Sequence, residues 1–168
     1  MTPGDRETRF RELSERSCAR WAGIARAYSG NSDRDDLLQE ILLQIWKSLD
    51  RFDGRSSPET WAYRIALNTA LAWNRNHRTR ANLLKSSTTD VASLAGEIRG
   101  ESSEMRVLAE FLKSLSPGDR AVMLLFLDDV SSADAAEILG TTEGALRVRM
   151  HRIRKRFEET YCDAENEQ

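Results

Sequence analysis

Apolar side chains recur along this chain with the spacing of α-helices rather than of strands. The clearest stretch follows residues 32–35 (Ser-Asp-Arg-Asp), which have the pattern of a capping box and predict the start of a helix. Its apolar stripe advances in steps of three and four residues and consists of Leu37, Leu38, Ile41, Leu42, Ile45, Trp46 and Leu49. Runs of β-branched residues with period two are absent, so we expect an all-α fold.

Two more helices are expected around that one, and the three together form a first block over residues 8–80. The later helix follows a break at residues 53–56, with Ser57 as its N-cap and Pro58 at its first position, where proline is tolerated. We expect it to continue to about His77. The earlier helix is indicated by an apolar stripe made of Phe10, Leu13, Cys18, Trp21, Ile24, Ala25 and Tyr28.

A second block over residues 105–161 carries the start and stop signals of shorter helices. The first helix is expected over Met105–Leu115, and capping boxes that begin at Ser116 and Ser131 open the next two. Between the blocks, residues 81–104 are rich in Ser, Thr, Gly and Glu and have few large apolar side chains. We therefore expect two small helical domains joined by a flexible linker.

The end of the second block has the dimensions of a helix-turn-helix. A short helix over Ala135–Leu139 is expected to stop at Gly140, which supplies a tight turn. Thr141 or Thr142 then caps a last helix that is expected to run to about Tyr161.

That last helix combines one apolar stripe with a dense basic face. Leu146, Met150, Ile153 and Phe157 recur at helical spacing and are expected to pack inward. From 143 to 157 there are six formal positive charges and one negative charge. Such a helix fits the major groove of DNA, where arginine pairs with guanine edges and other cations neutralise phosphates. A solvated basic face on a structural helix is the alternative, and the preceding short helix and glycine turn favour DNA binding over it.

Position along that helix divides its expected DNA contacts into two groups. We expect its N-terminal end to approach bases through Thr142, Glu143, Gly144 and Arg147. The later basic residues are expected to meet phosphates, and these are Arg149, His151, Arg152 and Lys155.

Both blocks resemble the sigma-70 family of RNA polymerase sigma factors, and most of all its small extracytoplasmic-function (ECF) group. The stretch LGTTEGALRVRMHRIRKRF resembles the recognition helix of sigma domain 4. In the first block, DRDDLLQEILLQIWKSLDRFDG is similar to the core-binding helix of sigma domain 2, and SSPETWAYRIALNTALAWNR is similar to its −10 recognition and melting segment. The resemblance implies an alternative sigma factor that binds core RNA polymerase, at the β′ clamp coiled coil and the β flap, and directs promoter recognition, DNA melting and initiation.

The resemblance also implies roles for residues of the first block. Asp36, Gln39 and Glu40 stand where the family contacts the β′ coiled coil, and they alternate with the apolar stripe, so they should face solvent. Residues 60–80 carry four arginines and no acid, which suits single-stranded DNA. The residues implied in −10 recognition are Phe52, Ser56, Ser57, Trp61, Tyr63, Arg64, Asn68, Arg75 and Arg78. A place in the core is the alternative expectation for Trp61.

Two departures from the family pattern bear on specificity. Pro58 stands where many relatives carry an aromatic residue, so the loop expected to capture a −10 base could differ in specificity. Ala145 replaces a residue that is commonly threonine, which removes one hydroxyl contact from the recognition helix.

Charge, cysteine usage and hydropathy change this picture little. The formal net charge is −2, and Cys18 and Cys162 belong to no Cys/His cluster, so we expect free thiols, no metal and no cofactor. The first 20 residues are polar, and no apolar run approaches the ~20 residues that span a bilayer. We expect a cytoplasmic protein without membrane insertion, and an anti-sigma factor as a further partner by family habit.

Two other classes of protein fit the sequence less well. A stand-alone helix-turn-helix regulator would leave the first block unexplained and would need a dimerisation surface that nothing marks. An all-helical hydrolase would have to use Cys18 or Cys162 as nucleophile, or a metal held by Asp33, Asp35, Asp36 and Glu40. No histidine accompanies those acids, so we expect no catalytic residues and no enzyme.

Overall fold

The computed structural model describes residues 3–30, 32–85 and 102–161, and the chain divides into two compact units. Unit 1 lies within Met1–Arg99 and unit 2 within Gly100–Gln168. Every regular element in the described ranges is a helix, which confirms the expected all-α class. The part of the expected linker over residues 86–101 lies outside the described residues.

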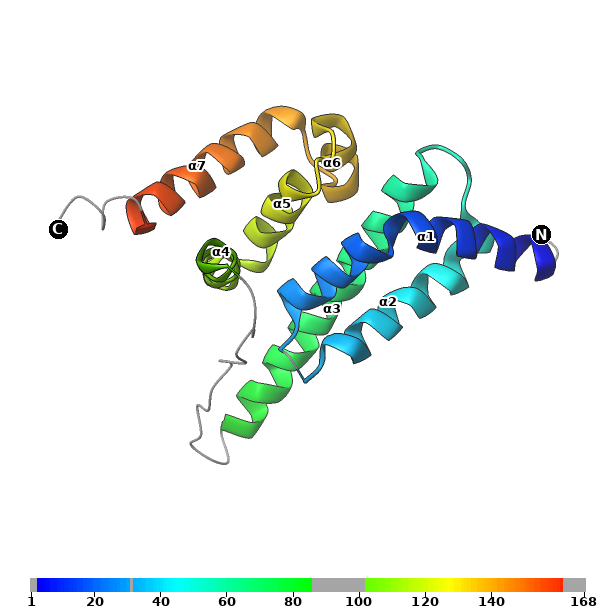
Figure 1. Ribbon diagram of the computed structural model, residues 1–168, viewed down its shortest axis with the longest axis horizontal. Coiled ribbons are helices and arrows are strands. Elements are labelled where there is room, and N and C mark those ends of the chain that lie inside the picture. The colour runs from blue at the N-terminus through cyan, green and yellow to red at the C-terminus, as the bar shows by residue number, and fades with distance from the viewer. Residues whose placement is uncertain (1–2, 31, 86–101, 162–168) are drawn as a thin grey trace. The chain divides into compact units, whose positions relative to one another are not determined.

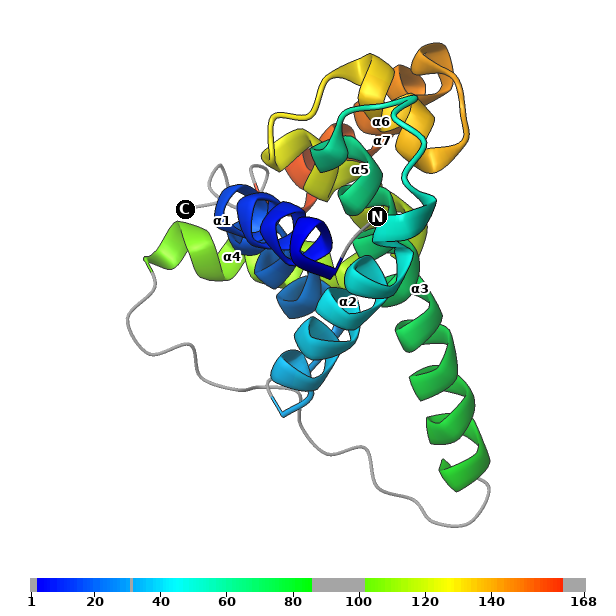
Figure 2. The same ribbon diagram turned by 90° about the vertical axis from the view of Figure 1, so that its right-hand side faces the viewer.

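Unit 1 is a bundle of three long helices that pack against one another (Figure 1). They are α1 (Pro3–Tyr28), α2 (Arg34–Ser48), which a 3₁₀ turn η1 (Leu49–Arg51) extends, and α3 (Pro58–Lys85). Both views show the C-terminal part of α3 continuing past the ends of the other two helices (Figures 1 and 2). The fully buried large side chains of unit 1 form one core, and they are Trp21, Ile24, Leu37, Ile41, Ile45 and Leu67.

The buried stripe of α1 differs from the expected one at one position. Cys18 is exposed, whereas Ser17 is only 3 % exposed. Ser17 lies four residues from both Leu13 and Trp21, so a 3.6-residue period places it on their line and turns Cys18 outward. The polarity of serine hid this position from a pattern based on apolar residues alone.

The expected capping box at the start of α2 is not formed. Asp33 is the N-cap residue, with φ −107° and ψ 3°, and its side chain makes no capping hydrogen bond. The Ser32 hydroxyl instead donates to the Asp33 carboxylate at 3.0 Å. An N-cap residue usually has extended backbone angles, which Asp33 lacks, so its side chain does not reach the free N–H groups and this helix depends on its buried stripe.

The start of α3 follows the expectation and its end does not. The Thr60 N–H donates to the Ser57 hydroxyl at 3.0 Å, which confirms Ser57 as the N-cap. The helix runs to Lys85 rather than to His77, and residues 81–85 of the expected linker therefore belong to it. No glycine or proline interrupts residues 59–85, so no local signal stops the helix earlier.

The described part of unit 2 contains four helices: α4 (Ser103–Ser114), α5 (Pro117–Leu127), α6 (Ser132–Leu139) and α7 (Glu143–Tyr161). Helices α5 and α6 both pack against α7, and α4 packs against α5. An aromatic contact anchors α4 to α7, because the rings of Phe111 and Phe157 meet edge to face with centroids 4.9 Å apart. The most deeply buried side chains of this unit include Phe111, Leu115, Val122, Leu125 and Ile153.

Local capping defines the helices of unit 2. The hydroxyls of Ser116 and Ser131 accept hydrogen bonds from the N–H groups of Asp119 and Asp134, each at 3.1 Å, as the two expected capping boxes require. Such a cap contributes about 1 kcal/mol to helix stability. Gly140 ends α6 in the left-handed region with φ 62°, where glycine avoids a steric penalty.

Candidate nucleic-acid and polymerase interfaces

The helix-turn-helix of unit 2 presents one face of α7 to solvent. Leu146 and Ile153 are buried against α5 and α6, and Met150 and Phe157 are half-buried, so the expected stripe is confirmed. The Ala145 N–H donates to the Thr142 hydroxyl at 3.2 Å, which identifies Thr142 as the cap. Away from that stripe, the exposed basic side chains are Arg147, His151, Arg152, Arg154, Lys155 and Arg156.

Arg149 differs from its basic neighbours because it is tied to α5. Its Nε donates to Oδ1 of Asp119 at 2.6 Å, and the Ser116 hydroxyl donates to Oδ2 of the same carboxylate at 2.7 Å. Gly118 allows this approach, since a Cβ atom at that position would lie 2.6 Å from Nη2 of Arg149. Arg149, expected as a phosphate contact, is thus engaged within unit 2 and orients α7 on α5.

The charge state of Asp119 follows from the same contacts. Partial burial raises the pKa of its carboxyl group, but hydrogen bonds from Arg149 and Ser116 and the positive charges of Arg149 and Arg152 outweigh it. The pKa of Asp119 therefore lies below its usual value of 3.8. The carboxylate stays ionised at neutral pH and keeps its ion pair with Arg149.

Three other cations of α7 also have partners within unit 2. Arg156 donates to the Ser114 carbonyl at 3.3 Å, and Lys155 lies 3.7 Å from Glu159. The Arg154 guanidinium lies 4.7 Å from the centre of the Phe126 ring. By contrast, Arg147, His151 and Arg152 form no hydrogen bond or ion pair with another described residue. They are therefore the basic groups of α7 most available to an anionic partner.

A polar face of α2 brings together the residues expected to contact polymerase. Asp36 and Gln39 are exposed, and Glu40 is half-buried and accepts a hydrogen bond from Gln44 at 2.7 Å. The exposed Leu43 lies one turn further along the same face, with 42 % of its surface accessible. Sequence analysis missed Leu43, although its place outside the regular stripe is the signal that could have found it.

The N-terminal part of α1 holds the other end of α2. The Arg6 guanidinium donates to the Trp46 carbonyl at 2.6 and 3.2 Å and lies 4.6 Å from the centre of the indole ring. It also lies 3.4 Å from the Asp50 carboxylate, and the Phe10 ring meets Trp46 edge to face at 5.3 Å. Arg6 thus neutralises the C-terminal end of α2 immediately before the loop that leads to α3.

Phe52, in the loop between η1 and α3, packs against Trp61 near the start of α3, and both are among the residues expected to recognise DNA. The rings of Phe52 and Trp61 have centroids 5.3 Å apart. They line a mostly apolar cavity of about 300 Å³ together with Leu49, Pro58 and residues of α1. Trp61 is half-buried in the wall of this cavity.

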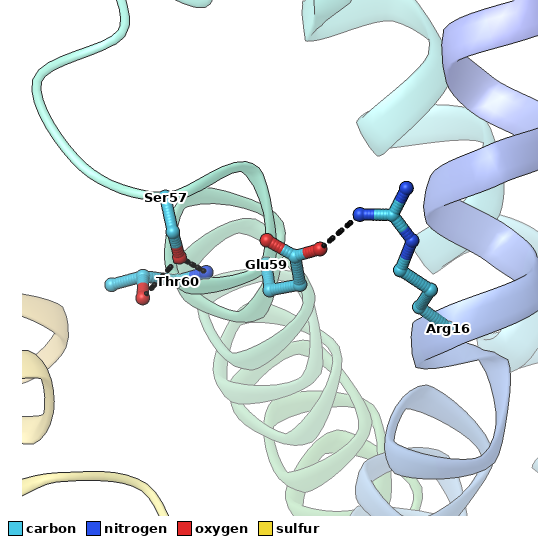
Figure 3. A network of polar contacts seen from close by, with 4 residues as sticks. All are labelled: Arg16, Ser57, Glu59 and Thr60. Atoms are coloured by element: carbon cyan, nitrogen blue, oxygen red, sulfur yellow. Dashed lines mark hydrogen bonds and ion pairs between the residues drawn. The ribbon is translucent and has the colours of Figure 1, made fainter.

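Polar contacts fix the first turn of α3 beside that cavity. Figure 3 shows the Ser57 hydroxyl at the start of the helix, where it accepts from the Thr60 N–H at 3.0 Å and donates to the Thr60 hydroxyl at 2.8 Å. It also shows Arg16 of α1 reaching Glu59 at 3.0 Å. The Ser57 hydroxyl, expected to meet DNA, is thus engaged as a helix cap.

The remaining residues expected to contact the −10 element, in the loop before α3 and on α3 itself, are not equally accessible. Asn68 and Arg75 are exposed, and Ser56 and Arg64 are half-buried. Tyr63 is only 3 % exposed and lies in the bundle core, so its ring is not accessible in this structure. The side chain of Arg78 lies outside the described part of the chain.

Sequence analysis also missed an aromatic pair further along α3. The rings of Trp73 and His77 stack with centroids 4.7 Å apart and an interplanar angle of 20°. The His77 Nδ1 atom lies 3.7 Å from the Asp33 carboxylate at the start of α2. The i, i+4 spacing of two ring side chains was the available signal.

The described residues contain no group of three or more His, Cys, Asp or Glu side chains placed to hold a metal ion. Across the same ranges, no helix is long and apolar enough to cross a membrane. Cys18 is an exposed thiol, and Cys162 lies outside the described residues.

Comparisons with known proteins agree with the division into two units. The model of Sigma-70 region 2 matches residues 16–80, and the model of Sigma-70 region 4 matches residues 105–157. The ECF RNA polymerase sigma-E factor of Haemophilus influenzae is 30 % identical over 168 residues, which cover 92 % of this chain and 88 % of the relative. The chain therefore belongs to the sigma-70 family, within its extracytoplasmic-function group.

Two further likenesses extend this result. The ECF RNA polymerase sigma factor SigG of Mycobacterium tuberculosis is 30 % identical over 154 residues, or 75 % of this chain, which spans only 41 % of the length of SigG. The solved structure of CnrH in complex with the cytosolic domain of CnrY matches with a TM-score of 0.68 and 26 % identity. That match covers 94 % of this chain and 90 % of CnrH.

Proposed function

We propose that this chain is an alternative sigma factor, which binds core RNA polymerase and directs it to promoters. The observation that carries the proposal is the exposed, unpaired basic group of α7 (Arg147, His151 and Arg152), in a unit that matches sigma region 4. A separate unit on the same chain matches sigma region 2. A stand-alone helix-turn-helix regulator would leave that second unit without a role.

In this proposal α7 docks in the major groove of the −35 element. Its N-terminal turn, with Thr142, Glu143 and Gly144, approaches the bases together with Arg147. His151, Arg152 and Lys155 contact phosphates along the groove, and the charges of Arg152 and Lys155 make binding depend on salt. Arg149 acts indirectly, because its ion pair with Asp119 sets how α7 lies on α5.

Unit 1 provides the contacts to polymerase and to opened DNA. The exposed face with Asp36, Gln39 and Glu40, extended by Leu43, binds the β′ coiled coil through hydrogen bonds and one apolar contact. Unpaired −10 bases contact the loop and α3, and this binding favours the melted state. The side chains that we propose for the −10 contacts are Phe52, Ser56, Trp61, Arg64, Asn68 and Arg75.

Regulation by an anti-sigma protein is a further part of the proposal. CnrH, which shares 26 % identity with this chain, has been solved with the cytosolic domain of CnrY bound to it. A comparable partner would keep this chain from polymerase by covering its binding surfaces. A pull-down from the native host that recovers polymerase and no other stoichiometric partner would contradict this part.

Run-off transcription with purified core polymerase and a library of genomic promoter fragments tests the main proposal. Adding the full chain should produce new, discrete transcripts, and Gln39→Ala and Arg147→Ala should abolish them. Glu15→Ala and Arg106→Ala are matched controls, because these exposed side chains lie on helices α1 and α4, outside both proposed surfaces. If the chain shifts duplex DNA but neither binds core polymerase nor changes initiation, the stand-alone regulator replaces this proposal.

A further inference from the structure

An apolar side chain lies in the middle of the exposed face of α7. Val148 has 61 % of its surface accessible, the highest value among the large exposed hydrophobic residues in the described ranges. A β-branched residue is a poor helix former, and an exposed one gains nothing from packing. The fold of unit 2 therefore does not explain why a valine occupies this position.

Helix geometry places Val148 opposite the buried stripe. At about 100° per residue, it is turned by about 200° from the buried Leu146, so it points almost directly away from α5 and α6. Gly144 lies one turn before it and Arg152 one turn after it on the same face. Val148 is thus at the centre of the outward surface of α7.

The turn before Val148 carries unusually little side-chain bulk. A Cβ atom at Gly144 would meet nothing within 4 Å, and no positive φ requires a glycine there. Its neighbour Ala145 is also exposed. Since unit 2 does not need a glycine at this helical position, the bare backbone is better explained by the close approach of a partner.

The charges around the surface formed by Gly144, Ala145 and Val148 identify the partner as duplex DNA. Arg147, His151 and Arg152 surround Val148, and none of them is paired within the described part of the chain. In the major groove, phosphates flank base edges, and the C5-methyl group of thymine is the apolar feature among those edges. A valine cannot form hydrogen bonds, so its selective contact with a base pair is with that methyl group.

We propose that Val148 reads a thymine in the −35 element through its C5-methyl group, with Gly144 and Ala145 allowing α7 to approach closely. This proposal rests on the proposed role of α7. It adds a specificity-determining residue that hydrogen-bonding chemistry alone does not reveal, and it makes an A·T pair a requirement of the element.

Removing a single methyl group from the DNA tests the contact directly. Promoter DNA with a randomised −35 segment is selected for binding to the polymerase holoenzyme that contains the full chain. Each thymine of the selected element is then replaced by deoxyuridine, which lacks only the C5-methyl group. The affinities of holoenzymes with the natural chain, Val148→Ala, Val148→Thr and Arg147→Ala are compared on each duplex.

We expect one uracil substitution to weaken binding of the natural holoenzyme about fourfold, as the loss of one buried methyl-sized contact implies. With Val148→Ala, which loses both γ methyl groups, the difference in affinity between the thymine and uracil duplexes should shrink, whereas Val148→Thr, which keeps one γ methyl group, should retain more of it. Arg147→Ala should weaken binding to both duplexes by the same factor. Thermal melting should find Val148→Ala folded, because the side chain is exposed.

The outcomes separate this inference from the proposal beneath it. If the selected element binds but no uracil substitution distinguishes the natural chain from Val148→Ala, the valine does not read thymine, and a protein partner is the better explanation of its exposure. A selected element that contains no A·T pair would likewise show that the valine does not read thymine. If selection enriches no sequence, the −35 role of α7 fails and this inference fails with it.

Discussion

The two units of this chain reach their functional surfaces by different physical routes. In unit 2, serine caps and Gly140 set the helix ends, and the side of α7 that we propose to face DNA is the side opposite its buried stripe. In unit 1, the candidate surface depends on contacts between distant segments, such as Arg6 with Trp46 and Phe52 with Trp61. Local signals thus indicate which side of α7 faces outward in unit 2, whereas contacts between distant segments shape the candidate surface of unit 1.

The largest expected effect tests whether the two units fold independently. Trp21 is fully buried in unit 1, so Trp21→Ala should lower the free energy of unfolding of that unit by about 3–5 kcal/mol. Its indole N–H has no hydrogen-bond partner among the described residues, so the control Trp21→Phe should cost much less. Amide spectra recorded during melting should show unit 2 unchanged. Joint unfolding of both units would show that they do not fold independently.

Removing the Arg6 contacts should perturb the loop of unit 1 more than its core. Arg6→Ala loses hydrogen bonds to the Trp46 carbonyl and the contact with Asp50, which together should cost about 1–2 kcal/mol. Exposed Arg11 on the same helix provides the matched control, Arg11→Ala. Hydrogen exchange should speed up at the C-terminal end of α2 and in residues 52–57, and unchanged exchange there would show that the loop does not depend on Arg6.

A smaller effect is expected at the cap of α3, a local signal of the kind that also defines the helices of unit 2. Ser57→Ala should destabilise unit 1 by about 1 kcal/mol, whereas Ser57→Asp should retain most of the stability, because aspartate also caps helices. Chemical denaturation of the two variants measures the difference. Equal losses would mean that the serine contributes something other than capping.

The smallest effect concerns the Asp119–Arg149 ion pair of unit 2, and it depends on pH. Asp119→Asn should cost no more than about 1 kcal/mol at neutral pH, because both side chains are partly exposed. The pKa of Asp119 is lower in the folded than in the unfolded chain, so its contribution is full above pH ~4 and disappears as the pH falls through the folded pKa.

Melting temperatures of unit 2 measured against pH test this prediction. The natural chain and Asp119→Asn should differ at pH 7 and converge as the pH falls below the usual pKa of an aspartate. A difference that stays constant down to acidic pH would show that the ion pair does not link α7 to α5.

Much of the fold was predictable because its signals are local. The 3.6-residue period located α2 and α7, and the Ser116, Ser131 and Gly140 signals placed helix ends in unit 2 within a few residues. Prediction failed where a tertiary contact replaced a local one. Cys18 points outward because Ser17 occupies the buried line, and Asp33 carries no side-chain cap, so α2 depends on the burial of Leu37 and Ile41.

The sequence by itself determined the all-α class, the helix-turn-helix and the basic face of α7, because periodicity, caps and charge are properties of neighbouring residues. Only the tertiary structure decided which side chains on those elements are available. It engages Arg149 with Asp119, buries Tyr63 and leaves Val148 exposed. Accessibility depends on what other helices cover, and that information lies in contacts between residues far apart in the chain.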